Sequence, residues 1–398
     1  MKKFLFVAIA MAGMVLFSCQ KDEIPQIEEQ SSDVVKYTPQ VIEGKFIVLF
    51  EDAGLLKSAS LGGDVTREAV LQVTHDVFSM MDLPLREPDF VYSSALRGIA
   101  VEMTNNEAMK LAQAPGVKAV YPDMWITVDL PRAMAKPTKP APTPVAQTTP
   151  WGITRVGGGA TYTGTAKAWI IDTGVDLDHP DLFVNTTLDK DFINNDLIAD
   201  DDNGHGTHCA GIVAAKNNTV GVVGVAAGAQ VVPVKVLDRR GSGAYSVIIA
   251  GVDYVRTTAA IGDVANLSLG GGVYAAIDAA VVALGEKGVK VALAAGNESD
   301  DANNHSPARA NGTNLYTVSS MATGDVWSSF SNYGNPPVDF CAPGSSIYST
   351  YKGGGYTTMS GTSMAAPHVC GLLLWGTVKT SGYVNGDPDG NPDPIAHK

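Results

Sequence analysis

Between residues 146 and 380, short runs of apolar residues alternate with stretches that have the periodicity of a helix. The apolar runs are 168–171, 231–237, 265–269 and 289–294, and the helical stretches are 246–257 and 274–287. A strand that is apolar along its whole length is buried on both faces. The pattern therefore predicts an α/β fold, a parallel sheet with helices on both faces. In such folds the functional residues lie at the carboxyl ends of the strands.

A proline-rich stretch at 131–150 separates this part of the chain from a smaller one, and it predicts an extended linker over 129–145. The smaller part, 41–128, alternates strands with helices and is predicted to be a small α+β domain. Its expected strands are 45–50, 97–103 and 116–121, and its expected helices are 67–81 and 106–112, the second capped by Thr104. The α/β domain spans 146–380, and 381–398 is predicted to be a polar C-terminal tail.

Residues 1–18 have the features of an export signal, because two lysines precede an apolar run that is too short to cross a membrane. The run ends in Leu-Phe-Ser-Cys, which resembles the lipobox of bacterial lipoproteins and implies a lipid on Cys19. An ordinary signal peptide with a chance cysteine is the alternative. The polar residues 19–40 are then a tether. We expect an exported protein, anchored by its lipid to a bacterial membrane, in the periplasm or at the cell surface.

The formal net charge of −13 argues against nucleic acid as a partner, because phosphate binding needs clustered Lys and Arg. Two acidic stretches, 200–203 and 387–393, are interpreted as solvated charge rather than as cation sites. Beyond Cys19 the cysteines are Cys209, Cys341 and Cys370, and their spacing fits no zinc site. We expect buried free thiols, with one disulfide possible.

Three short motifs carry residues that work together in nucleophilic catalysis. Asp172 ends the apolar run 168–171 and begins Asp-Thr-Gly. His205 begins His-Gly-Thr-His-Cys-Ala-Gly, and Ser363 lies in Gly-Thr-Ser-Met-Ala-Ala-Pro-His, each at the start of a helix. A serine hydroxyl becomes a nucleophile when a histidine takes its proton and a carboxylate holds that histidine in the right tautomer. A helix N-terminus adds backbone N–H groups where negative charge develops.

The three motifs, in this order, resemble the active-site signatures of subtilisin-like proteases, the subtilase family. The resemblance implies a serine endopeptidase that hydrolyses extended polypeptides through an acyl-enzyme. It implies that Asp172 orients the histidine, that His205 is the general base and acid, and that Ser363 is the nucleophile. His208 is implied to be structural. Asn297, in Ala-Ala-Gly-Asn after an apolar run, matches the asparagine of the family's oxyanion hole.

The same resemblance implies a substrate cleft between two chain segments. The matching residues are Gly241, Ser242 and Gly243 on one side, Ser268, Leu269 and Gly270 on the other, and Ala294 and Gly296 in the first specificity pocket. A substrate that pairs through its main chain needs little from its side chains, so broad specificity is expected. Small residues in the pocket leave room for a large apolar side chain, and Glu298 at its mouth tolerates a basic one.

A structural Ca²⁺ ion is also implied. Its ligands would be the side chains of Gln147, Asp181 and Asn218 and the backbone carbonyls of Lys216, Val220 and Val222. An all-oxygen shell of this kind suits Ca²⁺. The alternative is that each is an ordinary polar loop residue.

Residues 41–128 resemble the inhibitor-like propeptide that precedes many subtilases, with 114–123 similar to its last strand. This implies an intramolecular inhibitor, cut from the enzyme near Val128 and trimmed toward Ala146; a permanent accessory domain is the alternative. Motifs of esterases, metalloproteases and nucleotide-binding proteins are absent. The serious functional alternative is a catalytically inactive subtilase-fold lipoprotein that acts as a binding module. Only residues 364–398 follow Ser363, fewer than the family usually has, so the rim of the fold is expected to differ.

Overall fold

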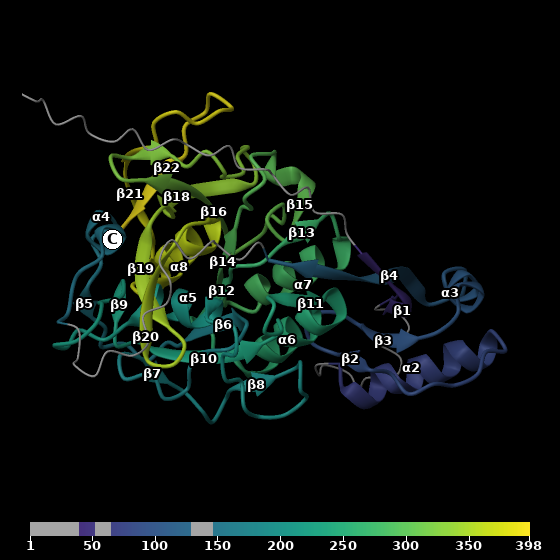
Figure 1. Cartoon of the computed structure of the whole chain (residues 1–398). Helices are drawn as coiled ribbons and strands as arrows, with labels where there is room; N and C mark the ends of the chain where they lie inside the picture. Colours follow the sequence, from purple (N-terminus) through teal and green to yellow (C-terminus); the bar gives the residue numbers. More distant parts are fainter. Residues whose placement is uncertain (1–39, 52–64, 129–145) are drawn as a thin grey trace, which may run out of the picture. The chain divides into compact units, whose positions relative to one another are not determined.

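The computed structural model describes residues 40–51, 65–128 and 146–398 (Figure 1). The expected export signal, the lipidation site Cys19, nearly all of the tether and the linker 129–145 lie outside the described residues. Within the described part, no helix combines the length and the apolar character needed to cross a membrane.

The first domain is built on an antiparallel sheet. Its strands are β1 (Gln40–Phe50), β2 (Phe90–Tyr92), β3 (Gly98–Glu102) and β4 (Val117–Thr127), in the spatial order β4-β1-β3-β2. Its helices are α2 (Arg67–Met80) and α3 (Asn105–Leu111). Thr104 caps α3 as predicted, and Glu107 accepts the Thr104 N–H in return, which satisfies two backbone donors. Strand β4 continues past its predicted end at residue 121.

Both faces of the first domain's sheet are apolar, because side chains alternate along β1 and both sets are hydrophobic. Phe46, Val48 and Phe50 pack in one core with residues of α2 and α3. Ile47 and Leu49 point the other way. They join a core with α6 (Tyr245–Thr258) and α7 (Ala275–Glu286) of the second domain. The sheet therefore lies between its own helices and those of its neighbour.

The second domain contains the predicted parallel sheet. Its strands, in spatial order, are β22 (Pro394–His397), β18 (Val338–Pro343), β16 (Leu315–Ala322), β14 (Lys290–Ala294), β12 (Val264–Leu267), β6 (Ala168–Asp172), β10 (Gln230–Lys235) and β7 (Phe183–Val184). Each of these strands runs parallel to its neighbours. All four predicted apolar runs are strands of this sheet.

Helices cover both faces of the parallel sheet, as the sequence predicted. Trp169 and Ile171 of β6 face the core that contains α6 and α7. Ala168 and Ile170 face the opposite core, which contains α5 (His205–Ala214) and α8 (Thr362–Leu373). His205 at the start of α5 contacts Asp172 at the end of β6, and Ser363 near the start of α8 contacts Ser268 just past the end of β12, so both helices begin at the carboxyl edge of the sheet.

The last residues of the chain differ from the predicted polar tail. Strand β22 pairs in parallel with β18 through Ile395 and Cys341, and β21 (Lys379–Tyr383) pairs with β22 in antiparallel fashion. Ile395 and Val384 are buried with Met321 and Cys341. The segment therefore completes the edge of the sheet. Helix α8 ends at Leu373, and the chain then returns to the sheet through β21 and β22.

Shorter elements complete the second domain. They are α4 (Trp151–Arg155), β5 (Ala160–Thr161), β8 (Lys190–Asp191), β9 (Ala226–Ala227), β11 (Ser242–Ala244), β13 (Gly271–Gly272), a 3₁₀ turn at Ala302–Asn304, β15 (His305–Ser306), β17 (Val326–Trp327), β19 (Ile347–Tyr351) and β20 (Gly355–Met359). β19 and β20 form a hairpin, and two of its backbone carbonyls lie within hydrogen-bond distance of His208 of α5.

Candidate active site

Asp172 and His205 form a buried pair at the carboxyl edge of the sheet. Asp172 is the last residue of β6, and His205 is the first residue of α5. The Asp172 Oδ1 and His205 Nδ1 atoms are 2.8 Å apart, and neither side chain is exposed to solvent. Asp172 Oδ1 also accepts the backbone N–H of Thr173, which fixes the carboxylate. His205 Nε2 has no hydrogen-bond partner among the described residues, so it is available to take a proton.

A close contact between the first two motifs sets the geometry of this pair. A Cβ at Gly206 would lie 2.0 Å from the carbonyl oxygen of Gly174 and 3.2 Å from Asp172 Cβ. Only glycine therefore lets α5 begin this near to the end of β6. The Thr173 hydroxyl accepts the backbone N–H of Gly206 and ties the two motifs together.

Asp201 is buried behind the pair, which differs from the predicted solvated charge at 200–203. Its carboxylate accepts the hydroxyls of Thr173 and Thr207 at 2.9 and 2.6 Å and the backbone N–H groups of Asn203, Gly204 and Thr207. These donors replace water around the buried charge, and the carboxylate in turn satisfies the free backbone N–H groups at the buried start of α5. An Asp just before a helix is a capping signal in sequence, and it would have identified this residue.

The charge of Asp172 controls the protonation of His205. Burial lowers the pKa of His205, but the charge of Asp172 and the hydrogen bond to it outweigh that effect, so the pKa is raised above the ordinary histidine value. His208 differs, because burial holds its pKa at about 3. Its Nε2 lies 3.1 and 3.2 Å from the carbonyl oxygens of Ile347 and Thr357. His208 is therefore neutral and joins α5 to the β19–β20 hairpin.

Ser363 is the second residue of α8 and is 5% exposed. Its hydroxyl donates to the carbonyl oxygen of Ser268 at 3.2 Å. The Ser268 hydroxyl in turn donates to the carbonyl oxygen of Ser363 at 2.8 Å, and Cys209 of α5 reaches the same oxygen. These contacts hold the start of α8 against α5 and against the end of β12.

Asn297 follows β14 and is fixed by the residue that precedes Ser363. The Thr362 backbone N–H and hydroxyl both donate to Asn297 Oδ1, at 2.8 and 3.0 Å. The amide nitrogen of Asn297 donates to no atom of the described residues, so it is free to bind a negative oxygen beside Ser363. Gly296 has φ +108°, and a Cβ there would lie 2.2 Å from Asn332 Nδ2, so the approach to Asn297 requires glycine.

The first domain inserts its last described residues into the predicted cleft. β4 pairs with β11 in antiparallel register, Thr127 opposite Ser242 and Ile126 opposite Gly243, and the Val128 N–H donates to the Gly241 carbonyl (Figure 1). Ile126 is fully buried, and its Cγ2 lies 2.9 Å from the position of a Cβ on Gly271, just beyond Gly270. An extended chain thus pairs with one of the two segments predicted to bind substrate, 241–243, and contacts Gly271, next to the other segment, 268–270.

Two buried carboxylates lie where the domains meet. Asp123 accepts the Ser246 backbone N–H and hydroxyl at the start of α6, at 3.1 and 2.5 Å. Asp253 of α6 accepts the backbone N–H groups of Ser94 and Ala95 at 2.8 and 2.5 Å. Burial raises the pKa of both carboxyls. Each domain therefore satisfies orphan donors of the other.

The six residues predicted to bind calcium lie close together in the structure. Asp181 is fully buried, and its carboxylate accepts the Asn218 amide at 2.7 Å and the Val222 N–H at 3.0 Å. The Lys216 N–H donates to the Asp181 carbonyl, and Val220 and Ala146 form a bridge beside Gln147. Burial raises the pKa of Asp181, and none of the ion pairs in the described part involves it. Asn218 presents its nitrogen to Asp181.

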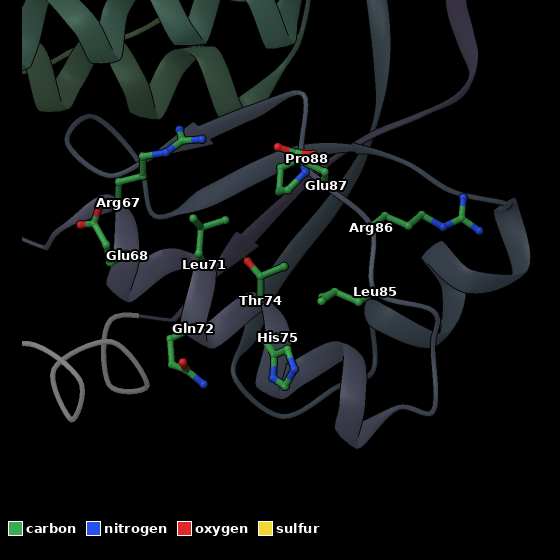
Figure 2. Close-up of a pocket in the computed structure, with 10 residues that line it drawn as sticks. All are labelled: Arg67, Glu68, Leu71, Gln72, Thr74, His75, Leu85, Arg86, Glu87 and Pro88. Carbon is green, nitrogen blue, oxygen red and sulfur yellow. The ribbon is translucent and has the colours of Figure 1, made fainter.

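The remaining predicted features lie elsewhere. Cys209, Cys341 and Cys370 are free and buried, as expected. In the acidic stretch 387–393, Asp393 is buried and accepts the Ser319 hydroxyl, while Asp389 is exposed. A hollow of about 520 Å³ lies in the first domain, between α2 and residues 85–88 (Figure 2). None of the predicted catalytic, substrate or calcium residues lines it.

Comparison with known proteins agrees with this geometry. A sequence profile of the subtilase family matches residues 167–375, and one of peptidase inhibitor I9 matches 64–129. The chain is 37% identical over 357 residues to a cuticle-degrading protease of Metarhizium anisopliae, covering 85% of the chain and 82% of the relative. It is 35% identical over 397 residues to an extracellular serine proteinase of Thermus sp. strain Rt41A, covering 94% and 91%. A solved cold adapted subtilisin-like serine proteinase is similar with TM-score 0.55 and 38% identity, covering 62% of the chain and 97% of that structure.

Proposed function

The chain belongs to the subtilase family of serine proteases, and from this premise we propose that it is an exported endopeptidase made as a self-inhibited precursor. The observation that carries the proposal is the buried 2.8 Å contact between Asp172 Oδ1 and His205 Nδ1, joined through Cys209 to the helix that bears Ser363. An inactive binding module is not favoured, because every side chain that the reaction needs is present.

In the proposed reaction, the Ser363 hydroxyl attacks the carbonyl carbon of the substrate while His205 Nε2 takes its proton. Asp172 holds the imidazole in the tautomer that leaves Nε2 free, and it stabilises the imidazolium that forms. His205 then gives the proton to the leaving amine, and the acyl-enzyme is hydrolysed by water activated in the same way. The Ser363 hydroxyl must turn from the Ser268 carbonyl toward His205 for the first step, and such contacts commonly tighten only when substrate binds.

The oxyanion of the tetrahedral intermediate is held by two fixed donors, the Asn297 amide and the backbone N–H of Ser363. Because Thr362 holds the Asn297 oxygen, the amide nitrogen is positioned before the substrate arrives. Donors that are fixed in advance stabilise the charge without reorganisation during the reaction.

Substrates are extended polypeptides that pair with β11 on one side and with residues 268–270 on the other. The support for this is the propeptide strand β4, which pairs with β11 through its main chain. Main-chain pairing makes few demands on side chains, so we propose broad specificity, with a preference for large apolar residues beside Ala294 and Gly296. Glu298, whose carboxylate lies 2.6 Å from the position of a Cβ on Gly296, allows basic residues there as well.

A calcium ion bound to Gln147, Asp181 and Asn218 and to the carbonyls of Lys216, Val220 and Val222 is part of the proposal. Its support is that Asp181 is a buried carboxylate with no cationic partner among the described residues, and burying such a charge is costly without a counter-charge. Calcium would stabilise the loop 216–222; for this, the Asn218 amide has to present its oxygen. The ion takes no part in the chemistry.

Export and a lipid on Cys19 are part of the proposal; the N-terminal sequence supports both, and the extracellular relative supports export. The test of the whole proposal is self-cleavage. The chain without its first 18 residues would be expressed as wild type and as Ser363→Ala, and both would be followed by intact mass and N-terminal sequencing. We expect a cut between Val128 and Trp151 in the wild type alone. If neither protein is cut although both fold, the proposal of a self-processing protease is wrong.

A further inference from the structure

A cavity of about 300 Å³ lies where the first domain meets α6 and α7, away from the cleft. Its polar side chains are Ser94, Arg97 and Lys118 from the propeptide and Arg256 and Glu286 from the catalytic domain. One water molecule takes about 30 Å³ of liquid volume, so the cavity has room for a polyatomic ion and several waters.

Positive charge exceeds negative charge in this cavity. None of the three cations makes an ion pair in the described part of the chain. Arg97 donates to the Ser94 and Leu96 carbonyls, and Arg256 donates to the Ser94 hydroxyl at 2.9 Å and to the Ala283 carbonyl. The two guanidinium groups thus converge on one residue, although like charges repel. The nearby Asp253 carboxylate accepts hydrogen bonds from the backbone N–H groups of residues 93–95 and forms no ion pair with these cations.

An unsatisfied donor is the second observation. Arg97 Nε is buried and has no hydrogen-bond partner among the described residues. A buried donor without an acceptor is costly, and an anion with several oxygens would satisfy it together with the free N–H groups of Arg256 and Lys118.

We propose that this cavity binds a tetrahedral oxyanion, sulfate or phosphate, which joins the propeptide to the catalytic domain. Arg97 and Lys118 come from one domain and Arg256 from the other, so the complete site exists only while the domains are together. By linkage, an anion that binds the complex and not the separated domains makes their separation less favourable. The anion therefore delays release of the propeptide. The inference rests on propeptide inhibition and adds a ligand that regulates it.

The first test is binding to the full chain with Ser363→Ala, which keeps both domains present and uncut. Sodium sulfate is titrated by calorimetry against sodium chloride of equal ionic strength. We expect saturable binding with one site, weakened at least tenfold in Lys118→Gln and in Arg256→Gln. Lys118 is exposed and its side chain makes no hydrogen bond with the described residues, so its substitution should leave folding intact. Lys110→Gln, the same charge change at an exposed position of helix α3, is the matched control and should bind sulfate normally.

The second test is the rate at which the wild-type chain becomes active. At a sulfate concentration ten times its dissociation constant, the propeptide should bind about tenfold more tightly. The lag before protease activity appears should lengthen accordingly. The lag of Lys118→Gln should not respond to sulfate, and the activity of fully activated enzyme should be the same in both salts. No saturable binding, or equal binding by Lys118→Gln and the Lys110→Gln control, would overturn the inference. Activity itself would stand in either case, which separates this inference from the proposed function.

Discussion

Thr362 holds Asn297 with two hydrogen bonds, from its backbone N–H at 2.8 Å and from its hydroxyl at 3.0 Å. The hydroxyl also accepts the Gly296 N–H at 3.1 Å. The residue before the proposed nucleophile therefore positions the side chain proposed to bind the oxyanion, and the two parts of the site cannot shift independently.

The first prediction concerns this contact. Asn297→Ala removes the proposed oxyanion donor, and kcat should fall about 10²–10³-fold, a magnitude known from subtilisin, with little change in KM. Thr362→Val keeps the shape but removes the hydroxyl, and kcat should fall by a smaller factor. In the double variant the Thr362 effect should vanish, because nothing is left to position. Steady-state kinetics on a peptide substrate measures all three, and additive losses would contradict the positioning role.

The second prediction concerns pH. His205 must be neutral to take a proton, so activity is lost as the pH falls through its pKa, which Asp172 raises. Asp172→Asn removes that charge and leaves burial, which lowers the pKa of His205, opposed only by the charge of Asp201. The acid limb of kcat/KM should therefore move to lower pH. The kcat should also fall about 3 × 10⁴-fold, the size known for the equivalent carboxylate of subtilisin. An unmoved acid limb would show that another group titrates.

The third prediction concerns calcium. An ion at one hundred times its dissociation constant adds about 2.7 kcal/mol to the free energy of unfolding. Chelation should therefore lower the melting temperature by about 5–10 °C for a domain of this size. The measurement is thermal unfolding of the Ser363→Ala chain, which cannot digest itself. Asp181→Asn should abolish the response to chelator, whereas Asp389→Asn in the exposed loop should keep it. The reverse pattern would move the site to residues 387–393.

The fourth prediction concerns the propeptide strand. Ile126 is fully buried against Gly271, and shortening a buried isoleucine to alanine costs about 2–5 kcal/mol. Ile126→Ala should weaken propeptide binding about 30-fold or more and shorten the lag before activity appears. Met109→Ala, an exposed change of similar size, is the control. Equal lags in the two variants would mean that Ile126 contributes nothing to inhibition.

The sequence predicted the parts of the fold that are governed by local pattern. Each apolar run became a buried strand, and the Thr104 cap formed because its partner Glu107 is three residues away. β22 was missed, since a strand of four residues has no periodicity of its own and exists through its pairing with β18. The extension of β4 to Thr127 was missed for the same reason: its partner β11 is more than one hundred residues away.

The site shows the same division. The motifs around Asp172, His205 and Ser363 could be read from the chain because each keeps its residues within a few positions. Asp201 was misread as a solvated charge although its place just before α5 is a local capping signal; its bond to Thr173, in contrast, forms only after β6 and α5 come together. The contact of the Ser363 hydroxyl with Ser268 likewise depends on how α8 packs on β12, which no local signal encodes.

The pairing of β4 with β11 has a consequence for how this inhibitor could evolve. Residues 125–127 pair with β11 through main-chain hydrogen bonds, which any extended chain can form. This pairing therefore cannot distinguish the enzyme's own propeptide from another. Recognition of the enzyme's own propeptide must therefore come from the contacts outside the cleft. In these, Asp123 accepts hydrogen bonds from Ser246, and Asp253 accepts them from the loop 93–95. A propeptide from another protein that reproduced these contacts would inhibit the enzyme as its own propeptide does. Substitutions at these contacts would instead end cross-inhibition between related enzymes, although the cleft stayed unchanged.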